Sequence, residues 1–454
     1  MKMLTKLLTK IKNADFILVT LSTVACSAMS FIFSVYNKSV VPTKPLGIYS
    51  TCLLAMTYMN YAQFGVLNAY NRDYPQALGR RDYDEANRLK STAMTFMLMV
   101  YAAIFVIFEI WVAIYYHGKI SRDIEQAYYA FGYALCPILI LFKSFDDMAN
   151  ATVRMNGHYN KSAIIGLIRT ILALTIGIIA INVAGYFGLY AMTLSSAVLG
   201  VLMFKNEAFK GASISFDFSY MKVMILSGLP LLINSLIWTI VQSVDKFVIL
   251  GFLSTEDLGV YTVPLMGFTT MVLVPQTISQ VFYIKISHLY GANHDEQELL
   301  EKASSFTRVT SVLTGLACLA VFYIMPIFVH FFMPMYTEGT TATQILVIGV
   351  AVYATTMLYG NIFSVLRLNK SLIANSVALC IFNFAFSTSL VLFVERSINM
   401  VAIGTGLSYA LYSLMLMIKL SRRFNYSFIK LITKSWGPVV ALMVPGLLIY
   451  RLFF

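Results

Sequence analysis

The sequence has 454 residues, of which 59% are hydrophobic and 12% are charged. Because soluble domains carry about 25% charged residues, this composition excludes a soluble protein and predicts an all-α membrane protein with many spans. The apolar runs are continuous over about twenty residues, as in transmembrane helices, whereas the strands of a β-barrel would alternate over about ten. The formal charge of +12 does not indicate nucleic-acid binding, since the basic residues are scattered over short loops.

The cysteines and histidines show no pattern typical of a disulfide framework or a metal site. All five cysteines lie within apolar segments, and the five histidines form no zinc-binding motif. We therefore expect no metal site and no cofactor, and a proton or a sodium ion is the only candidate for a coupled small ion.

The first fourteen residues form an amphipathic pattern. On a helix, four lysines share one face and five apolar residues share the other: Lys2, Lys6, Lys10 and Lys12 against Met3, Leu4, Leu7, Leu8 and Ile11. Such a helix is expected to lie on an anionic membrane surface. The apolar run that follows is too long for the apolar region of a typical signal peptide. We predict a cytoplasmic surface helix over 1–14 and a first span from residue 15.

Twelve apolar segments are long enough to cross a bilayer. In chain order they are 15–36, 47–70, 92–116, 127–149, 162–183, 186–204, 224–252, 257–284, 306–333, 343–366, 372–394 and 399–420. A weaker segment at 436–454 contains two prolines and predicts either a tilted span or half of a hairpin. Prolines at 230, 264, 275 and 326 predict bends in spans seven, eight and nine, because proline removes a helical hydrogen bond.

The loops on one side of these spans hold most of the 33 lysine and arginine residues. Positive charge collects in cytoplasmic loops, so we predict a cytoplasmic N-terminus. The longest polar connections are 71–91 and 285–305. Neither could hold a catalytic domain, which argues against an enzyme.

Two halves of the chain repeat one another. The word LGIYS at 46–50 matches LGVYT at 258–262, and the same offset of 212 residues pairs Gly79 with Gly291 and Lys90 with Lys302. Because each repeat would contain an even number of spans, both copies have the same orientation, which predicts two lobes related by an axis along the membrane normal. We expect an N-lobe at 15–204, a cytoplasmic linker at 205–223, a C-lobe at 224–420 and an additional segment at 421–454.

Three motifs resemble those of bacterial polysaccharide flippases, which belong to the multidrug/oligosaccharidyl-lipid/polysaccharide exporter superfamily. They are GLPLL at 228–232, SVDKFVI at 243–249 and LGVY at 258–261, with a departure at Pro264, where the family usually has alanine nearby. The resemblance implies a location in the inner membrane of a bacterial cell and a MATE-like fold of two six-helix lobes that open alternately. It also implies an undecaprenyl-pyrophosphate-linked oligosaccharide as the substrate, flipped outward for O-antigen, capsule or exopolysaccharide synthesis. A partnership with the polysaccharide polymerase machinery is left open.

Charged residues inside the spans are the candidate site residues, since a charge in hydrocarbon normally faces a polar interior. Lys246 and Asp245 are adjacent in span seven, so they point about 100° apart and cannot pair well with each other. Lys246 is the strongest candidate for a contact with the pyrophosphate or sugar. A structural ion pair within one lobe is the alternative for both residues.

Arg169 in span five is a second candidate, because a guanidinium group matches phosphate oxygens in bidentate geometry. The alternative is that its side chain reaches the cytoplasmic headgroups. In span four, Lys143 and Asp147 are spaced for a pair within the helix, which leaves Asp146 to bind a sugar hydroxyl or a cation. We place Lys143 and Asp146 with the substrate cavity.

Glu109 in span three and Asp147 are candidates for the coupled ion. Arg72 and Asp73 at the inner end of span two are candidates for the cytoplasmic entrance, although anchoring at the interface would explain them equally well. Two other functions stay open. A cation-coupled multidrug exporter of the same fold would rely on acidic cavity residues, and a membrane-embedded glycan polymerase would need a catalytic cluster on a large outer loop.

Overall fold

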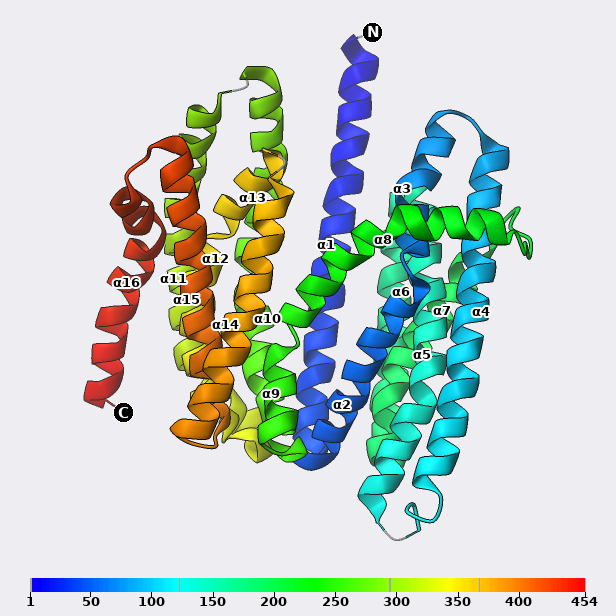
Figure 1. Cartoon of the computed structure of the whole chain (residues 1–454), viewed down its shortest axis with the longest axis horizontal. Helices are drawn as coiled ribbons and strands as arrows, with labels where there is room; N and C mark the ends of the chain where they lie inside the picture. The colour runs from blue at the N-terminus through cyan, green and yellow to red at the C-terminus, as the bar shows by residue number, and fades with distance from the viewer. Residues whose placement is uncertain (1, 122, 294, 367, 454) are drawn as a thin grey trace. The chain divides into compact units, whose positions relative to one another are not determined.

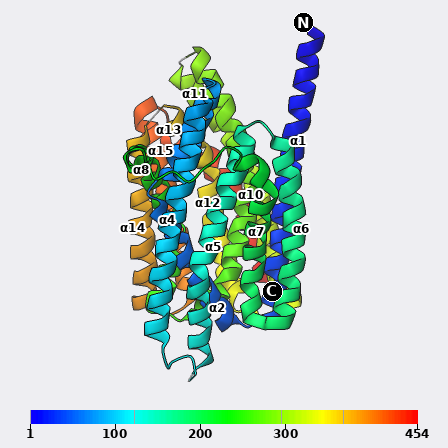
Figure 2. The same ribbon diagram turned by 90° about the vertical axis from the view of Figure 1, so that its right-hand side faces the viewer.

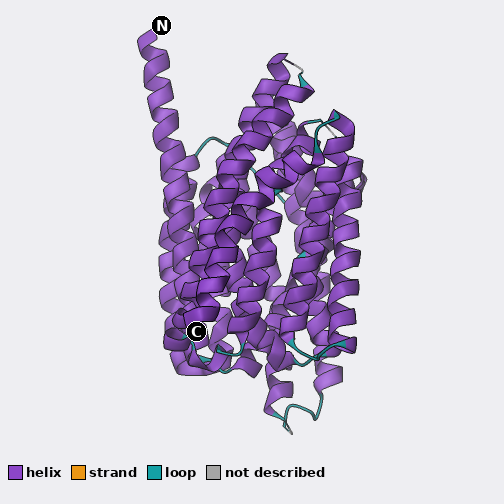
Figure 3. Ribbon diagram, turned by 90° about the vertical axis from the view of Figure 1, so that its left-hand side faces the viewer, coloured by secondary structure: helices purple, strands orange, loops and turns teal. Residues whose placement is uncertain are grey.

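The computed structural model describes residues 2–121, 123–293, 295–366 and 368–453. Throughout these ranges the regular structure is helical, and Figure 3 shows only helices joined by short loops. The chain divides into two compact units, Met1–Leu236 (unit 1) and Ile237–Phe454 (unit 2).

Unit 1 contains seven helices and the first part of an eighth. They are α1 Lys2–Val40, α2 Thr43–Met59, α3 Val66–Gly79, α4 Tyr83–Tyr116, α5 Ile124–Met155, α6 Tyr159–Ala184, α7 Ala191–Ala208 and α8 Phe218–Val241, with 3-10 turns at Asn60–Gln63 and Gly185–Tyr190. Helix α5 packs against α2, α4 and α7, and α6 packs against α1 and α7. Figures 1 and 2 show α4, α5, α6 and α7 side by side.

Unit 2 contains the remaining helices. They are α9 Val244–Phe252, α10 Thr255–Asn293, α11 Glu296–Phe332, α12 Gly339–Thr355, α13 Met357–Val365, α14 Asn369–Phe393, α15 Ile398–Phe424 and α16 Phe428–Phe453, with a 3-10 turn at Pro334–Tyr336. Helix α12 packs against α10, α11 and α15, α14 packs on α15, and α16 packs on α11. The predicted repeat offset of 212 residues also relates two helix N-termini: α2 begins at Thr43 and α10 begins at Thr255.

Ten segments of the described chain are long and apolar enough to cross a membrane. They include 428–448 in α16, so the weak C-terminal segment satisfies the same length and composition criteria as the others. The predicted surface helix at 1–14 is not a separate helix, because α1 is continuous from Lys2 to Val40.

Three predicted spans are interrupted. Span two breaks between α2 and α3, where Phe64 and Gly65 have positive φ angles of 47° and 86°. Span seven breaks between α8 and α9, and span ten breaks at Thr356 between α12 and α13. The prolines predicted to bend spans seven to nine lie inside helices that continue past them.

The break in span two has a clear steric reason. Gly65 and Gly228 of α8 approach so closely that a Cβ atom on either would overlap the other's backbone. The Tyr61 hydroxyl donates to the Ser235 carbonyl (3.1 Å), and Arg72 donates to the Ser227 carbonyl (3.2 Å). These contacts join the first part of α8 to unit 1.

The predicted linker is an ordered strap, residues 210–217, bound along α4. Its backbone amides at Ser213 and Ser215 donate to the hydroxyls of Ser91 (3.0 Å) and Thr95 (2.9 Å). The Lys90 ammonium donates to the Lys210 carbonyl (2.8 Å). The boundary between the two units therefore falls after the strap, within α8, and not in the predicted linker at 205–223.

A salt bridge closes the end of the strap. Arg88 binds the Asp217 carboxylate at 2.7 Å, and the backbone amide of Tyr220 donates to the same carboxylate at 3.0 Å. The Arg88 guanidinium, together with that amide, holds the pKa of Asp217 below its usual value. The phenol of Tyr220 lies under Arg88 and binds Glu85.

Candidate functional site: two buried carboxylates

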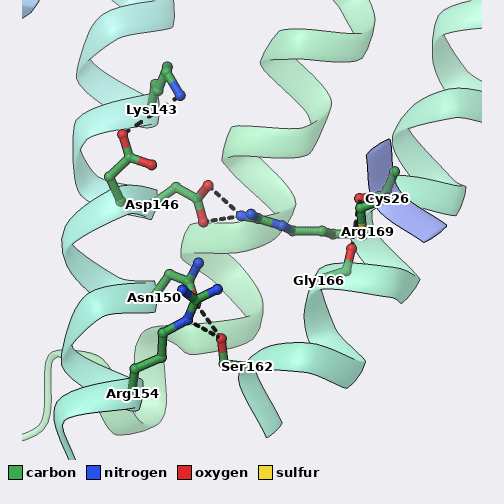
Figure 4. Close-up of polar contacts among 10 residues, drawn as sticks. Cys26, Lys143, Asp146, Asn150, Arg154, Ser162, Gly166 and Arg169 are labelled. Atoms are coloured by element: carbon green, nitrogen blue, oxygen red, sulfur yellow. Dashed lines mark hydrogen bonds and ion pairs between the residues drawn. The ribbon is translucent and has the colours of Figure 1, made fainter. Parts of the chain in front are cut away.

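Unit 1 buries a carboxylate and an arginine together. Asp146 of α5 is 6% exposed, and the Nη1 atom of Arg169 on α6 donates to both of its carboxylate oxygens. Figure 4 shows the two side chains reaching toward each other between the helices. The charge of Arg169 is thus paired within unit 1.

A glycine makes room for this pair. Gly200 of α7 faces it so closely that a Cβ atom would overlap both Asp146 Oδ1 and Arg169 Nη1. Three helices, α5, α6 and α7, therefore converge on the ion pair. Buried ions need this kind of enclosure, since their mutual attraction must offset a large desolvation cost.

A polar ladder continues along α5 and α6. The Arg154 Nε donates to the Ser162 hydroxyl at 3.0 Å, and that hydroxyl donates to the Asn150 Oδ1 at 2.5 Å, as Figure 4 shows. Lys143 and Asp147 form the predicted pair within α5, with 3.7 Å between Nζ and Oδ2. Both side chains of that pair are about half exposed, 47% and 51%, so they stand apart from the buried Asp146.

Unit 2 buries its carboxylate without a cation bonded to it. Asp245 of α9 accepts hydrogen bonds from Tyr261 of α10 (2.8 Å), Asn383 of α14 (2.9 Å) and Thr405 of α15 (2.8 Å). All three donors are neutral, and they come from three different helices. The negative charge is therefore positioned but not neutralised by hydrogen bonding.

The oxygens around Asp245 outnumber the protons that could join them. The Thr405 hydroxyl lies 2.8 Å from Asp245 Oδ1, 3.1 Å from Asn383 Oδ1 and 2.9 Å from the Val401 carbonyl. The Ser387 hydroxyl lies 2.9 Å from Asn383 Oδ1 and 3.4 Å from the Val401 carbonyl. Each hydroxyl has a single proton to donate, so two protons must serve five close oxygen–oxygen contacts. We name these five residues the Asp245 oxygen cluster.

Lys246 lies beside this cluster, partly buried on α9. It forms no hydrogen bond or ion pair with the part of the chain that the structure describes, and its interaction with the neighbouring Asp245 is electrostatic only. The adjacent Asp245 uses both carboxylate oxygens for the neutral donors. A structural ion pair, one of the two predicted alternatives for Lys246, is therefore not formed.

The other predicted site residues lie elsewhere. Arg72 binds Asp73 through two hydrogen bonds of 2.6 and 2.8 Å in the middle of α3. Glu109 lies partly exposed on α4. The structure brings together Asp146 with Arg169 in unit 1, and it leaves Lys143, Asp147, Arg72, Asp73 and Glu109 outside both buried sites.

Sequence reasoning missed most of the groups that hold the two carboxylates. Gly200 carries no polar group to mark it, and Asn383, Ser387 and Thr405 are neutral residues within apolar spans, which do not stand out as charged residues do. Tyr261 is the last residue of the LGVY motif, but the motif alone does not indicate that its hydroxyl binds Asp245. Neutral polar side chains spaced four residues apart, such as Asn383 and Ser387, were the available signal, because they share one face of a helix.

Comparison with known proteins gives the family and the fold. The family model described as "Polysaccharide biosynthesis protein" matches residues 74–338, more than half of the chain. No protein of curated function matches the sequence significantly.

Solved structures match almost the whole chain. The lipid II flippase MurJ in its inward closed conformation has a TM-score of 0.75 and 13% identity, over 96% of this chain and 93% of that one. An inward-facing multidrug resistance MATE family transporter of the MOP superfamily has a TM-score of 0.73 and 14% identity, over 87% and 94%. A MOP superfamily transporter from Pyrococcus furiosus has a TM-score of 0.62 and 14% identity, over 90% and 95%. These similarities confirm the predicted MATE-like, all-α fold.

Proposed function

The chain belongs to the polysaccharide biosynthesis protein family, and from this premise we propose that it flips undecaprenyl-pyrophosphate-linked oligosaccharides outward across the bacterial inner membrane. Alternating access of the two units, with a cytoplasmic N-terminus, would deliver repeat units for surface polysaccharide synthesis. Two findings support a lipid-linked substrate: the family is one of polysaccharide biosynthesis, and one structure of the same fold is a lipid II flippase. The protein acts as a transporter in this proposal, with no covalent chemistry.

The observation that carries the proposal is that Lys246 has no carboxylate in direct contact with it. A lysine at membrane depth costs roughly 2.5–3.5 kcal/mol on insertion scales, and the neighbouring Asp245 attracts it only through space. An anionic substrate would supply the missing partner. A pyrophosphate with about two negative charges fits this role, because it must itself be paired to cross about 30 Å of hydrocarbon.

The Asp245 oxygen cluster is the proposed site of a coupled cation. It has one carboxylate, two hydroxyls, an amide oxygen and a backbone carbonyl, and it has too few protons for their contacts. One negative charge surrounded by neutral oxygens matches a monovalent cation, a proton or a sodium ion. The cluster thereby replaces Glu109 and Asp147 as the candidate for ion coupling.

A bacterial strain that lacks its own flippase provides the test. Such a strain should accumulate the lipid-linked repeat unit on the inner leaflet, and this chain should restore surface polysaccharide. Lys246→Ala should abolish rescue at normal protein level, and Lys246→Arg should retain part of it because the charge stays. The matched control is Lys302→Ala, which removes an exposed lysine paired with Glu298 at 2.7 Å and should leave rescue unchanged. Full export by the Lys246→Ala protein would contradict the assignment of this residue.

The multidrug exporter is the competing function, favoured by the similarity to a MATE transporter. It predicts that deletion or overexpression changes drug susceptibility while the lipid-linked intermediate does not accumulate. Both carboxylates buried in spans are held by groups of the protein itself. Asp146 is therefore not free to pair with a cationic drug without first losing Arg169.

A further inference from the structure

The interior of unit 2 contains many buried polar side chains in addition to those of the Asp245 oxygen cluster. Along α11 a stripe of four residues is completely buried: Ser304, Thr307, Ser311 and Thr314. Their spacing of three and four places them on one helix face. The stripe begins near the end of α11 that is predicted to be cytoplasmic.

Three hydroxyls in this region have no hydrogen-bond partner among the described residues. They belong to Thr307 and Thr314 of α11 and to Tyr359 of α13. Each of these residues is 0% exposed. The Tyr359 and Thr307 hydroxyls are close enough to interact, but they do not form a bond of ordinary geometry. Buried polar atoms left this way are typically bonded to ordered water.

The break in span ten, at Thr356, lies three residues before Tyr359 in the sequence. Thr356, between α12 and α13, and Ser413 of α15 are fully buried, and their hydroxyl oxygens are 2.9 Å apart. Ser413 also donates to the Val352 carbonyl at 3.3 Å. Non-helical backbone at membrane depth is tolerated where it lines a hydrated or polar interior.

Helix α15 connects the break to Asp245. Thr405, Tyr409 and Ser413 are each four residues apart, so they form one row along the helix. Thr405 binds Asp245 at one end of the row, and Ser413 binds Thr356 at the other. In the middle, Tyr409 interacts electrostatically with Asp245 and stacks on Tyr353 with 4.9 Å between ring centroids.

The predicted cytoplasmic end of the route is closed by a lysine. The Lys434 ammonium on α16 donates to the Ser304 hydroxyl at 2.9 Å and to the Tyr426 hydroxyl at 3.1 Å. Neither partner is charged, so Lys434 can leave them at a small electrostatic cost. A positive charge at this position repels cations as long as it stays there.

We infer that a file of water molecules passes through unit 2 from the Asp245 oxygen cluster, by way of Thr356 and Thr307, to Lys434, and that it carries the coupled monovalent cation. This inference rests on the proposed function, since it supplies the route by which the ion bound at Asp245 reaches the cytoplasm. The titratable groups that the described helices place around Asp245 are Lys246, Tyr261 and Tyr409. Both a proton and a sodium ion are compatible with the route.

Silver-ion accessibility tests the route without any lipid-linked substrate. In a cysteine-free background, Thr356→Cys and, as a control from the apolar core of α12, Val350→Cys are exposed to Ag⁺ from the cytoplasmic face of inverted vesicles. Maleimide labelling after denaturation then counts the thiols that silver has not blocked. We expect silver to block Thr356→Cys at least tenfold faster than Val350→Cys. Equal rates at the two positions would overturn the inference, whatever the transported substrate is.

A functional test uses the hydroxyls that have no partner. The double substitution Thr307→Val with Tyr359→Phe removes two unsatisfied buried groups, so the protein should fold normally. In proteoliposomes it should lose most of the counterflow of cation, while Thr343→Val, whose hydroxyl bonds to its own helix at 2.7 Å, should not. Tracer sodium and a pH dye inside the vesicles report which ion moves. Unchanged counterflow in the double variant would refute the route.

Discussion

The two units stabilise their buried carboxylates in different ways. In unit 1 the partner of Asp146 is a cation, Arg169, and both side chains lie directly against Gly200 of α7. In unit 2 the partners of Asp245 are a phenol, an amide and a hydroxyl, and the nearest lysine is not bonded to it.

This difference separates the charge of Asp146, which is used in the structure, from the charge of Asp245, which can still attract a ligand. A buried pair that is neutral within itself gains little from a ligand, and breaking it is costly. A buried carboxylate that has only neutral donors keeps its charge for an incoming cation. Both carboxylates are buried, at 6% and 7% exposed. Unit 1 uses its carboxylate in a fixed contact between helices, whereas we propose that unit 2 uses its carboxylate to bind a cation.

The largest expected effect comes from breaking the pair in unit 1. Asp146→Ala should lower the free energy of unfolding by about 3–5 kcal/mol, because it leaves the Arg169 charge buried and unpaired. The double variant Asp146→Ala with Arg169→Met should recover most of that loss. Thermal unfolding in detergent measures both. If the double variant were no more stable than the single one, the pair would not be the origin of the effect.

In unit 2 the matching substitution should reduce transport more than stability. Asp245→Asn keeps the shape of the side chain but removes the charge for a cation and replaces one acceptor oxygen with an NH2 donor. We expect a loss of coupled transport of roughly 10–100-fold, the scale seen when partners of an ion site are removed, with little change in thermal unfolding. The comparison fails if Asp245→Asn unfolds as easily as Asp146→Ala while still transporting.

A smaller effect is expected from Gly200→Ala. The added methyl group overlaps the ion pair, and overpacking of this kind costs about 1–3 kcal/mol. Gly166→Ala on α6 is the control, because no atom lies within 4 Å of the new Cβ. It should be neutral or stabilising by about 0.5–1 kcal/mol, as alanine suits a helix better than glycine. Equal losses in both variants would show that the space beside the pair is not restricted.

The smallest effect concerns the exposed pair of Asp217 and Arg88 on the strap. The pKa of Asp217 is lowered in the folded protein from its ordinary value of 3.8, so its contribution to stability is present above that value. It is lost as the pH falls through the lower, folded-state pKa. The difference in melting temperature between the native protein and Asp217→Asn should therefore be slight at pH 7 and should vanish in strong acid. A difference that grows with acidity would contradict the assignment.

The sequence was sufficient for the helices and the family, because both depend on local patterns. Runs of apolar residues located the spans, and the words GLPLL, SVDKFVI and LGVY indicated the polysaccharide exporters. The pair of Lys143 and Asp147 was predictable for the same reason, since a spacing of four residues puts them on one helix face.

The partners of the buried charges could not be found this way, because they are distant in sequence. Arg169 lies 23 residues from Asp146, and Asn383 and Thr405 lie 138 and 160 residues from Asp245. No helical periodicity relates positions on different helices. The break in span two likewise depends on the approach of Gly65 to Gly228, which is a property of the packed unit and not of either segment.

The strap has a practical consequence for work on this protein. A polar stretch rich in serine and glycine invites the insertion of an epitope or a fluorescent reporter. Here such an insertion would pull backbone amides away from Ser91 and Thr95 and separate Asp217 from Arg88. The exposed turn at His117–Ile120 has no comparable set of contacts to lose, so it is the better position for a label.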